Sequence, residues 1–237
     1  MNQRAVLITG AAQRVGAAMA LHFAQNGYDI ALHYNLSQSA AGRIKKDIEQ
    51  LGARCVLLRH DMQDIAGIAN FMREVRAQMP YCTALVNNAS VFDRASFQET
   101  DEAFLDRQFT VNFKAPFFLT QAFSREFTEG CVINMLDSEI SGTQGSHFAY
   151  LLSKKALADF TAMAARQLGP YMRVNAICPG ILLPSNELDA AYIDRLSGDL
   201  PQRRVGTLEE VVSAALWLAQ SPVTGQFIYI DGGQQLL

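Results

Sequence analysis

Short apolar runs rich in β-branched residues alternate along the chain with longer segments in which apolar positions recur every three or four residues. This alternation is typical of a parallel sheet covered by helices on both faces. Seven runs are expected to form strands: Ala5–Thr9, Asp29–Tyr34, Arg54–His60, Ala84–Asn87, Cys131–Met135, Arg173–Ile177 and Phe227–Ile230. The helical segments are Val15–Asn26, Ser39–Leu51, Ile65–Gln78, Asp101–Phe127, Phe148–Leu168 and Leu208–Gln220. We therefore predict an α/β, Rossmann-type doubly wound fold with a seven-stranded parallel sheet.

The domain organisation is expected to be simple, with residues 1–237 forming a single domain, because no linker, repeat or low-complexity tract divides them. The segment 181–205 breaks the alternation, since it carries two prolines, several acids and a short helical pattern near Leu188–Leu196. In doubly wound folds ligands bind beyond the carboxyl ends of the strands. We therefore predict a substrate-loop insertion here; the alternative is a surface elaboration without a catalytic role.

The composition of the chain argues against several classes of protein. The formal net charge of −3 gives no basic excess of the kind found in proteins that bind nucleic acid or anionic membranes. The four cysteines form no CxxC pair, so neither a disulfide framework nor a metal site is expected, and a reducing cytoplasmic location is favoured. The uncharged stretch Val211–Ile230 is interrupted by Ser221–Gln226, which argues against a membrane span.

The first predicted strand leads into a glycine-containing turn, Thr9–Gly16, and then into an alanine-rich helix. Gly10 and Gly16 let the backbone approach a pyrophosphate, and the N–H groups at the helix start, around Val15, attract its charge. Arg14 stands where such a loop would more often have glycine, and it places a guanidinium beside the expected phosphates. The alternative is a plain tight turn.

The end of the second predicted strand indicates which dinucleotide is bound. It carries His33, Tyr34 and Asn35, and no acidic residue occurs between Ile30 and Arg43. Proteins that choose NAD usually place an acid here for the ribose 2′-hydroxyl. The absence of an acid favours NADP(H). Only Arg14 and His33, which is mostly neutral at pH 7, are available to lend positive charge to the 2′-phosphate. After the third strand, Asp61, followed by Met62, is a candidate acceptor for the adenine amino group or a cap for the next helix.

A tyrosine and a lysine four residues apart, Tyr150 and Lys154, open the long helix after the fifth strand. This spacing puts both side chains on one helical face. An ammonium beside a phenol is expected to lower the phenol pKa toward the range useful for proton transfer. Asp137, thirteen residues before Tyr150, is expected to face the same cleft.

Two further places along the chain carry candidate site residues. Asn112 lies in the longest helical pattern, where Pro116 predicts a local kink. Its amide is expected either to bond backbone carbonyls and a water leading to Lys154 or only to repair the kink. Asn88, Ala89 and Ser90 follow the fourth strand, where small and amide residues suit close approach to a cofactor ribose.

Together these residues resemble the short-chain dehydrogenase/reductase family over nearly the whole chain. The matching pieces are Thr9-Gly10, Asn87-Asn88-Ala89, Asn112, Tyr150-x-x-x-Lys154, Cys178-Pro179-Gly180 and Asp231-Gly232-Gly233. The resemblance implies a dinucleotide-binding catalytic domain. In it the tyrosine donates a proton, the lysine tunes the tyrosine and holds the nicotinamide ribose, the asparagine anchors a relay water, and Pro179 and Gly180 line the carboxamide.

A narrower resemblance is to pteridine reductases and bacterial dihydromonapterin reductases. These carry Thr-Gly-x-x-x-Arg-x-Gly and an aspartate thirteen residues before the tyrosine, where most family members have serine. It assigns Phe92 to stacking a pterin, Ser90 and Arg14 to substrate and cofactor contacts, and Asp137 with Tyr150 to proton delivery. The chain departs from the pattern at Leu36, where such enzymes tend to have an arginine for the 2′-phosphate. It departs again at Leu182 and Pro184, which replace hydroxyl residues, while Ser138 leaves open a shifted strand that restores the usual serine.

These features predict an NADPH-dependent reductase that converts a dihydropterin to a tetrahydropterin. The alternative enzyme reduces 3-oxoacyl thioesters or another ketone, and a non-enzymatic dinucleotide sensor is disfavoured because Tyr150 and Lys154 are both present. The expected partners are a small-molecule substrate and copies of the same chain in a homotetramer, because family members pair the helices around Asp101–Phe127 and Phe148–Leu168.

Overall fold

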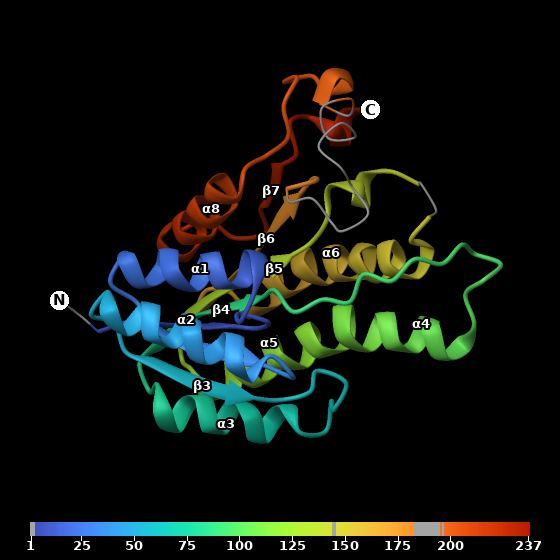
Figure 1. The fold of residues 1–237 in the computed structure, drawn as a ribbon. Coiled ribbons are helices and arrows are strands. Elements are labelled where there is room, and N and C mark those ends of the chain that lie inside the picture. The colour runs from blue at the N-terminus through green and yellow to red at the C-terminus, as the bar shows by residue number, and fades with distance from the viewer. Residues whose placement is uncertain (1–2, 144–145, 183–194, 196) are drawn as a thin grey trace.

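A computed structural model describes residues 3–143, 146–182, 195 and 197–237. Its centre is a sheet of seven parallel strands in the order β3-β2-β1-β4-β5-β6-β7 (Figure 1). The strands are β1 (Ala5–Ile8), β2 (Asp29–Tyr34), β3 (Cys55–Arg59), β4 (Cys82–Asn87), β5 (Gly130–Met135), β6 (Met172–Pro179) and β7 (Phe227–Ile230). All seven predicted strands are confirmed, with ends that differ by a residue or two, and the predicted doubly wound fold is correct.

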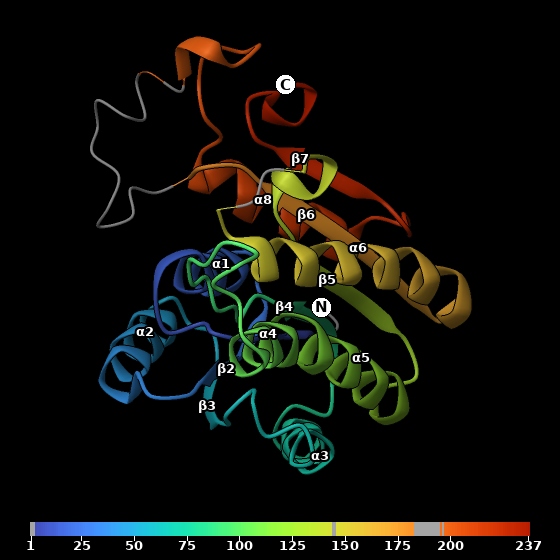
Figure 2. The same ribbon diagram turned by 90° about the vertical axis from the view of Figure 1, so that its right-hand side faces the viewer.

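Helices cover both faces of the sheet, as the near-continuous apolar strands require (Figure 2). One face packs on α1 (Arg14–Gln25), α2 (Gln38–Gln50) and α8 (Leu208–Gln220). The other packs on α3 (Ile68–Gln78), α5 (Ala115–Glu126) and α6 (Phe148–Leu168). At the start of α8, Thr207 and Glu210 form a capping box in which each side chain accepts from the other's backbone N–H.

The segment predicted as one helix over Asp101–Phe127 is three elements. It consists of α4 (Glu102–Phe109), the π-helical turn η1 (Thr110–Lys114) and α5. The irregularity expected at Pro116 is a π-helical turn, which ends just before α5, where Pro116 lies in the first turn and has no N–H to donate. Helix α3 begins at Ile68 rather than Ile65, since Asp64 accepts from the Gly67 N–H in the preceding turn.

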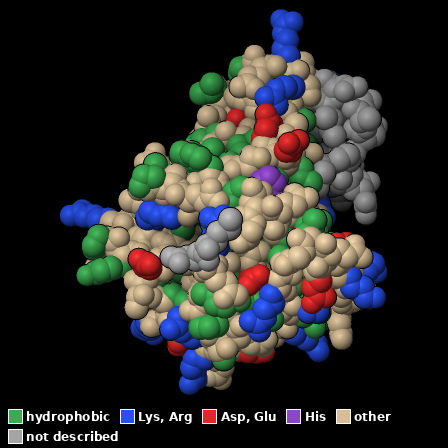
Figure 3. All heavy atoms as spheres, turned by 90° about the vertical axis from the view of Figure 1, so that its left-hand side faces the viewer, with side chains coloured by type: hydrophobic (Ala, Val, Ile, Leu, Met, Phe, Trp, Pro, Cys, Tyr) green, Lys and Arg blue, Asp and Glu red, His purple; other side chains and the backbone are tan. Residues whose placement is uncertain are grey.

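The carboxyl ends of β1, β4, β5 and β6 meet at one edge of the sheet, and the segments that follow them carry the candidate site residues. Apart from Arg195, the short helix expected near Leu188–Leu196 lies outside the described residues, as does Pro184. Within the described ranges no helix has the length and apolarity to cross a bilayer. On the face in Figure 3, lysine and arginine side chains are interspersed with acidic and apolar ones and form no continuous basic patch.

Candidate active site

The loop after β1 packs so closely on neighbouring backbone that two of its positions require glycine. Gly10 has a φ of +63°, and a Cβ added there would lie 3.1 Å from Ala89 Cα. A Cβ on Gly16 would lie 2.3 Å from the Gly10 carbonyl oxygen, so this position is restricted to glycine. The α1 N-cap, Gln13, makes no side-chain capping bond, and the first turn of α1 holds no acid. Its N–H groups and dipole therefore fit an anionic group, as the pyrophosphate interpretation requires.

Arg14 adopts a left-handed backbone with a φ of +50°. Such a conformation costs a non-glycine residue about 1–2 kcal/mol. The side chain is exposed at the start of α1, beside the loop that fits a pyrophosphate. Strain retained at a non-glycine residue is characteristic of functional sites.

The side chains of Thr9 and Asn88 hold this loop against the segment after β4. Thr9 Oγ1 accepts from the backbone N–H groups of Asn88 and Ala89, each over 2.9 Å. The Asn88 amide donates to the Thr9 carbonyl over 2.9 Å and to the Gly10 carbonyl over 3.2 Å. Asn88 therefore secures the shape of the loop through its side chain, a role that its position after β4 did not reveal.

His33 differs from its expected role as a positive group near the cofactor. Its ring is buried, Nδ1 accepts from the Gly10 N–H over 3.0 Å, and Nε2 donates to the His60 carbonyl over 3.0 Å. Burial lowers its pKa to about 4, so the ring is neutral at pH 7. The expectation that His33 lends charge to a 2′-phosphate is wrong, because the side chain turns inward and supports the loop.

The other residues expected near the adenosine are spread between surface and interior. Tyr34 is buried, Asn35 is half-buried, and Leu36 is 83% exposed. Asp61 is exposed and accepts from the Gln63 N–H over 3.0 Å, so it closes a turn and does not cap α3. Its neighbour Met62 is buried.

The three central residues of the predicted catalytic group come together at the carboxyl end of β5. Tyr150 Oη donates to Asp137 Oδ2 over 2.8 Å. Lys154 Nζ lies 5.6 Å from the centroid of the Tyr150 ring and donates to the Met135 carbonyl over 2.8 Å. Ser138 is buried and takes no part in this contact, so no shifted strand restores the serine.

The electrostatics of this group reverse one expectation. Burial, followed by the Asp137 carboxylate, raises the pKa of Tyr150 well above its usual value of 10. Burial also lowers the pKa of Lys154 to about 8. The prediction of a lowered phenol pKa is therefore wrong here, since desolvation and the Asp137 carboxylate raise the pKa of Tyr150. The phenol is held in its protonated, donor form.

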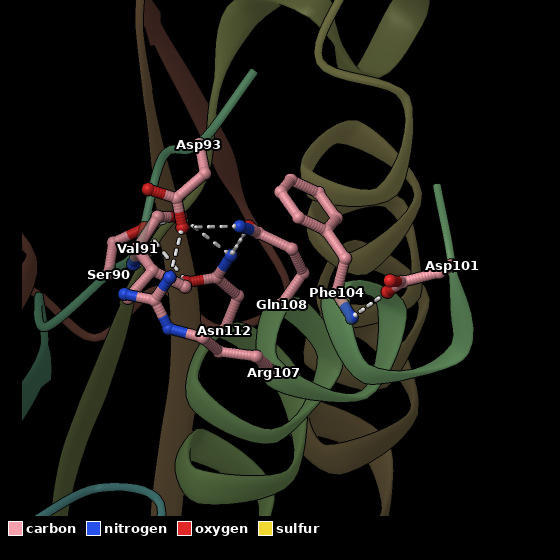
Figure 4. A network of polar contacts seen from close by, with 8 residues as sticks. All are labelled: Ser90, Val91, Asp93, Asp101, Phe104, Arg107, Gln108 and Asn112. Atoms are coloured by element: carbon pink, nitrogen blue, oxygen red, sulfur yellow. Dashed lines mark hydrogen bonds and ion pairs between the residues drawn. The ribbon is translucent and has the colours of Figure 1, made fainter. Parts of the chain in front are cut away.

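Asn112 lies in η1 and is completely buried, and Figure 4 shows its polar contacts. Its Oδ1 accepts from Ser90 Oγ and from the Val91 N–H, each over 2.9 Å. Its Nδ2 donates to the Val91 carbonyl over 3.0 Å and to Gln108 Oε1 over 3.1 Å. An amide side chain has two donors and two acceptor positions, so all four are used. The Asn112 side chain therefore bonds the segment after β4, and the relay water near Asn112 stays a prediction.

Phe92 projects from that segment toward Tyr150. Its ring lies edge-on to Tyr150, with centroids 4.6 Å apart, and stacks on His147 with centroids 4.0 Å apart. Sequence analysis did not single out His147, although its position three residues before Tyr150 places it one turn away at the start of α6. Asp93 and Gln108 were missed as well, since nothing in their local sequence links them to the site.

Pro179 is the last residue of β6, and Gly180 follows it beside the C-terminal segment. The Gly180 N–H donates to the Ile230 carbonyl over 3.0 Å. A Cβ on Gly180 would lie 2.9 Å from Asp231 Cβ, so a larger residue would push the two segments apart. Among the described residues no group of three or more His, Cys, Asp or Glu is placed to hold a metal.

The fold and this arrangement agree with the comparisons with known proteins. The family model described as enoyl-(acyl carrier protein) reductase matches residues 10–235. The chain belongs to the short-chain dehydrogenase/reductase family. It is therefore an oxidoreductase of a family that uses NAD(P)(H).

The similar proteins carry several different activities in their names. Dihydromonapterin reductase of Enterobacter sp. (strain 638) is 30% identical over 241 residues, which cover 99% of this chain and 98% of the relative. The 3-oxoacyl-[acyl-carrier-protein] reductase FabG of Staphylococcus epidermidis (strain ATCC 35984) is 26% identical over 247 residues and all of both chains. The crystal structure of FolM alternative dihydrofolate reductase 1 from Brucella suis, in complex with NADP, has a TM-score of 0.93 and 31% identity over 98% of this chain and 95% of its own.

Proposed function

We propose that this chain is an NADPH-dependent reductase that converts a dihydropterin to a tetrahydropterin. The observation that carries the proposal is the 2.8 Å hydrogen bond from Tyr150 to Asp137, with the Phe92 ring against the same tyrosine. A carboxylate suits the N–H edge of an aminated heterocycle, and an aromatic ring suits its flat face. Arg14, Ser90, Phe92, Asp137 and Tyr150 then form the substrate site.

The proposed cofactor site follows the edge of the sheet. The loop Gly10, Arg14, Val15 and Gly16 suits the pyrophosphate, because no side chain caps the N–H groups at the start of α1 and its first turn holds no acid. The remaining cofactor positions are His33 (through the loop), Tyr34, Asn35, Asp61, Met62, Asn88, Ala89, Ser90, Tyr150, Lys154, Pro179 and Gly180. The absence of an acid beside Tyr34 and the NADP in the FolM structures support NADP(H).

When bound, the dinucleotide supplies a hydride to the carbon of the substrate C=N bond. The chain supplies the proton at the adjacent nitrogen and the alignment. Tyr150 is the proposed donor, because its raised pKa keeps the phenol protonated. Asp137 holds the phenol and the substrate edge. Lys154 provides the nearby positive charge that offsets the phenolate left after transfer, and Asn112 holds Ser90 in place.

A reductase of 3-oxoacyl thioesters is the second candidate, and the FabG relative favours it. A dinucleotide sensor without turnover is disfavoured by the assembled Tyr150, Asp137 and Lys154. The two enzymes separate in one assay that follows NADPH oxidation with dihydrobiopterin, dihydromonapterin and dihydrofolate on one side and acetoacetyl thioesters on the other. Turnover of the thioesters alone would reject the pterin proposal, and NADPH binding without turnover of either class would favour the sensor.

We also propose that residues 1–237 act as one domain with 181–205 as its substrate loop, and that the chain assembles as a cytoplasmic homotetramer. Apolar side chains exposed on α5 and α6 support the assembly: Phe118, Leu152 and Met163. The four buried, unpaired thiols agree with a reducing compartment. Light scattering should give four times the 26.1 kDa chain mass, and a monomer would contradict the assembly.

A further inference from the structure

A chain of polar contacts joins α4 to the segment that carries Phe92 (Figure 4). At its outer end Asp93 Oδ2 accepts from Arg107 Nη1 over 2.8 Å and from Gln108 Nε2 over 3.0 Å. Gln108 Oε1 then accepts from Asn112 Nδ2 over 3.1 Å. Asn112 in turn bonds the backbone of Val91 in both directions. The contacts therefore run unbroken from a surface ion pair to the segment after β4.

The buried contacts of this network are expected to contribute more to stability than the exposed ones. Gln108 and Asn112 are fully buried, whereas Arg107 and Asp93 are partly exposed, and an exposed ion pair contributes little. A buried amide that loses its partner pays the desolvation cost of the unpaired group. Gln108 therefore fixes the link, since it is bonded to Asp93 on one side and Asn112 on the other.

These polar contacts hold the two residues on either side of Phe92 in the sequence. Val91 is held through its backbone by Asn112, and Asp93 is held through its carboxylate by Gln108. The Phe92 side chain itself is 58% exposed and touches the rings of His147 and Tyr150. Its position over the tyrosine thus depends on how firmly its two neighbours are held.

We propose that Gln108 and Asp93 are positioning residues, which hold Phe92 at the distance from Tyr150 that substrate stacking needs. This inference rests on the proposed function, because it assigns Phe92 to the substrate face. The two residues act through Phe92 and do not touch the reacting atoms.

The network is separable from the folding of α4. That helix has its own N-terminal cap, in which Asp101 Oδ1 accepts from the Phe104 N–H over 2.8 Å (Figure 4). Loss of the Gln108 amide is therefore expected to loosen residues 90–93 and leave the helix in place. This separation allows a test that distinguishes positioning from general destabilisation.

The test compares Gln108→Leu with wild type by hydrogen exchange and by steady-state kinetics. We expect faster amide exchange in the peptide containing residues 90–93, and unchanged exchange in peptides from β5 and the middle of α6. The KM for the dihydropterin should rise about tenfold, which corresponds to about 1.4 kcal/mol. The KM for NADPH should rise less than the KM for the dihydropterin, since Ser90 is the one proposed cofactor residue in the loosened segment and the α1 loop is not part of the network.

Three further variants complete the design. Asp93→Asn keeps an acceptor for the Gln108 amide, so it should retain most of the wild-type KM, whereas Asp93→Ala should resemble Gln108→Leu. Glu99→Ala is the matched control, because Glu99 lies in the same connecting segment but bonds Ser96 N and Oγ instead. It should leave exchange at residues 90–93 and both KM values unchanged.

The outcomes separate this inference from the proposed function. Unchanged exchange at residues 90–93 in folded Gln108→Leu would overturn the positioning role whatever the substrate is. If exchange rises there but wild type reduces no pterin, the proposed function fails while the link to Phe92 stands. Equal increases in KM for pterin and for NADPH would also reject the inference, because they indicate a general loss of structure.

Discussion

The phenol of Tyr150 donates its hydrogen bond to Asp137, and the two oxygen atoms involved are 2.8 Å apart. The other carboxylate oxygen of Asp137 accepts from the Glu139 N–H over 2.9 Å. One carboxylate thus fixes the orientation of the proton donor while a backbone contact fixes the carboxylate. In the proposed substrate complex, the pterin shares Asp137 with the tyrosine.

Replacement of the donor tests its role directly. Tyr150→Phe removes the proton but keeps the ring that contacts Phe92, so we expect turnover to fall by about 10²–10⁴. NADPH binding, followed by fluorescence titration of the nucleotide, should remain close to wild type. Retained turnover would overturn the assignment of Tyr150 as the acid.

The charge of Asp137 has a measurable effect on the tyrosine. Because the carboxylate raises the pKa of Tyr150, Asp137→Asn should lower that pKa while keeping a side chain of the same shape. The alkaline limb of the pH–rate profile should move to lower pH, as should the appearance of tyrosinate absorbance. Asp137→Ser is the companion variant, and it should reduce pterin turnover more than ketone turnover. Equal losses with both substrates would count against pterin selectivity.

His33 makes stability depend on acidity. Its pKa of about 4 in the folded protein lies below the ordinary 6.5, so between these values the unfolded chain binds a proton that the folded chain does not. The free energy of unfolding should therefore fall as the pH drops from about 6.5 to 4, by up to about 3 kcal/mol. In His33→Asn this part of the slope should vanish from urea melts at successive pH values, and an unaltered slope would exclude His33 as its source.

Arg14 combines backbone strain with a charge. Arg14→Gly relieves a cost of about 1–2 kcal/mol but adds roughly 1 kcal/mol of chain entropy to lose on folding, so stability should change little. The KM for NADPH should rise because the guanidinium is lost. Arg14→Lys is the control that keeps both the charge and the strained backbone. Unchanged NADPH affinity in the glycine variant would show that Arg14 does not contact the cofactor.

Leu36 offers a gain-of-function test. Its side chain is 83% exposed next to the expected 2′-phosphate position. Leu36→Arg should lower the KM for NADPH by about tenfold through a charge-assisted contact and leave the KM for NADH unchanged. If both values fall equally, the residue lies away from the 2′ position.

The strands and the Tyr150–Lys154 pair were predictable because their signals are local. A buried parallel strand is a continuous apolar run, and residues four apart on a helix share a face. The meeting of Asp137 with Tyr150 followed from the resemblance and from the place of each beside the fifth strand.

The electrostatics and the buried contacts could not be predicted in this way. The pKa of Tyr150 depends on how completely the fold removes water, and the spacing to Lys154 does not report this. From the sequence, His33 is a polar residue near the end of a strand. Its burial depends on contacts with Gly10 and His60, which the local sequence does not reveal. The partners of Asn112 include Val91, which lies 21 residues away and gives no sequence signal.

The joining of α4 to the segment after β4 bears on attempts to redesign this enzyme. Suppose residues 90–93 are replaced by the corresponding residues of a relative. The new loop then has to bond Gln108 and Asn112 of this chain, which are not the residues that it contacts in the relative. The Gln108 and Asn112 amides would then face groups that they cannot bond. Loop and helix therefore have to be transplanted together as one cassette.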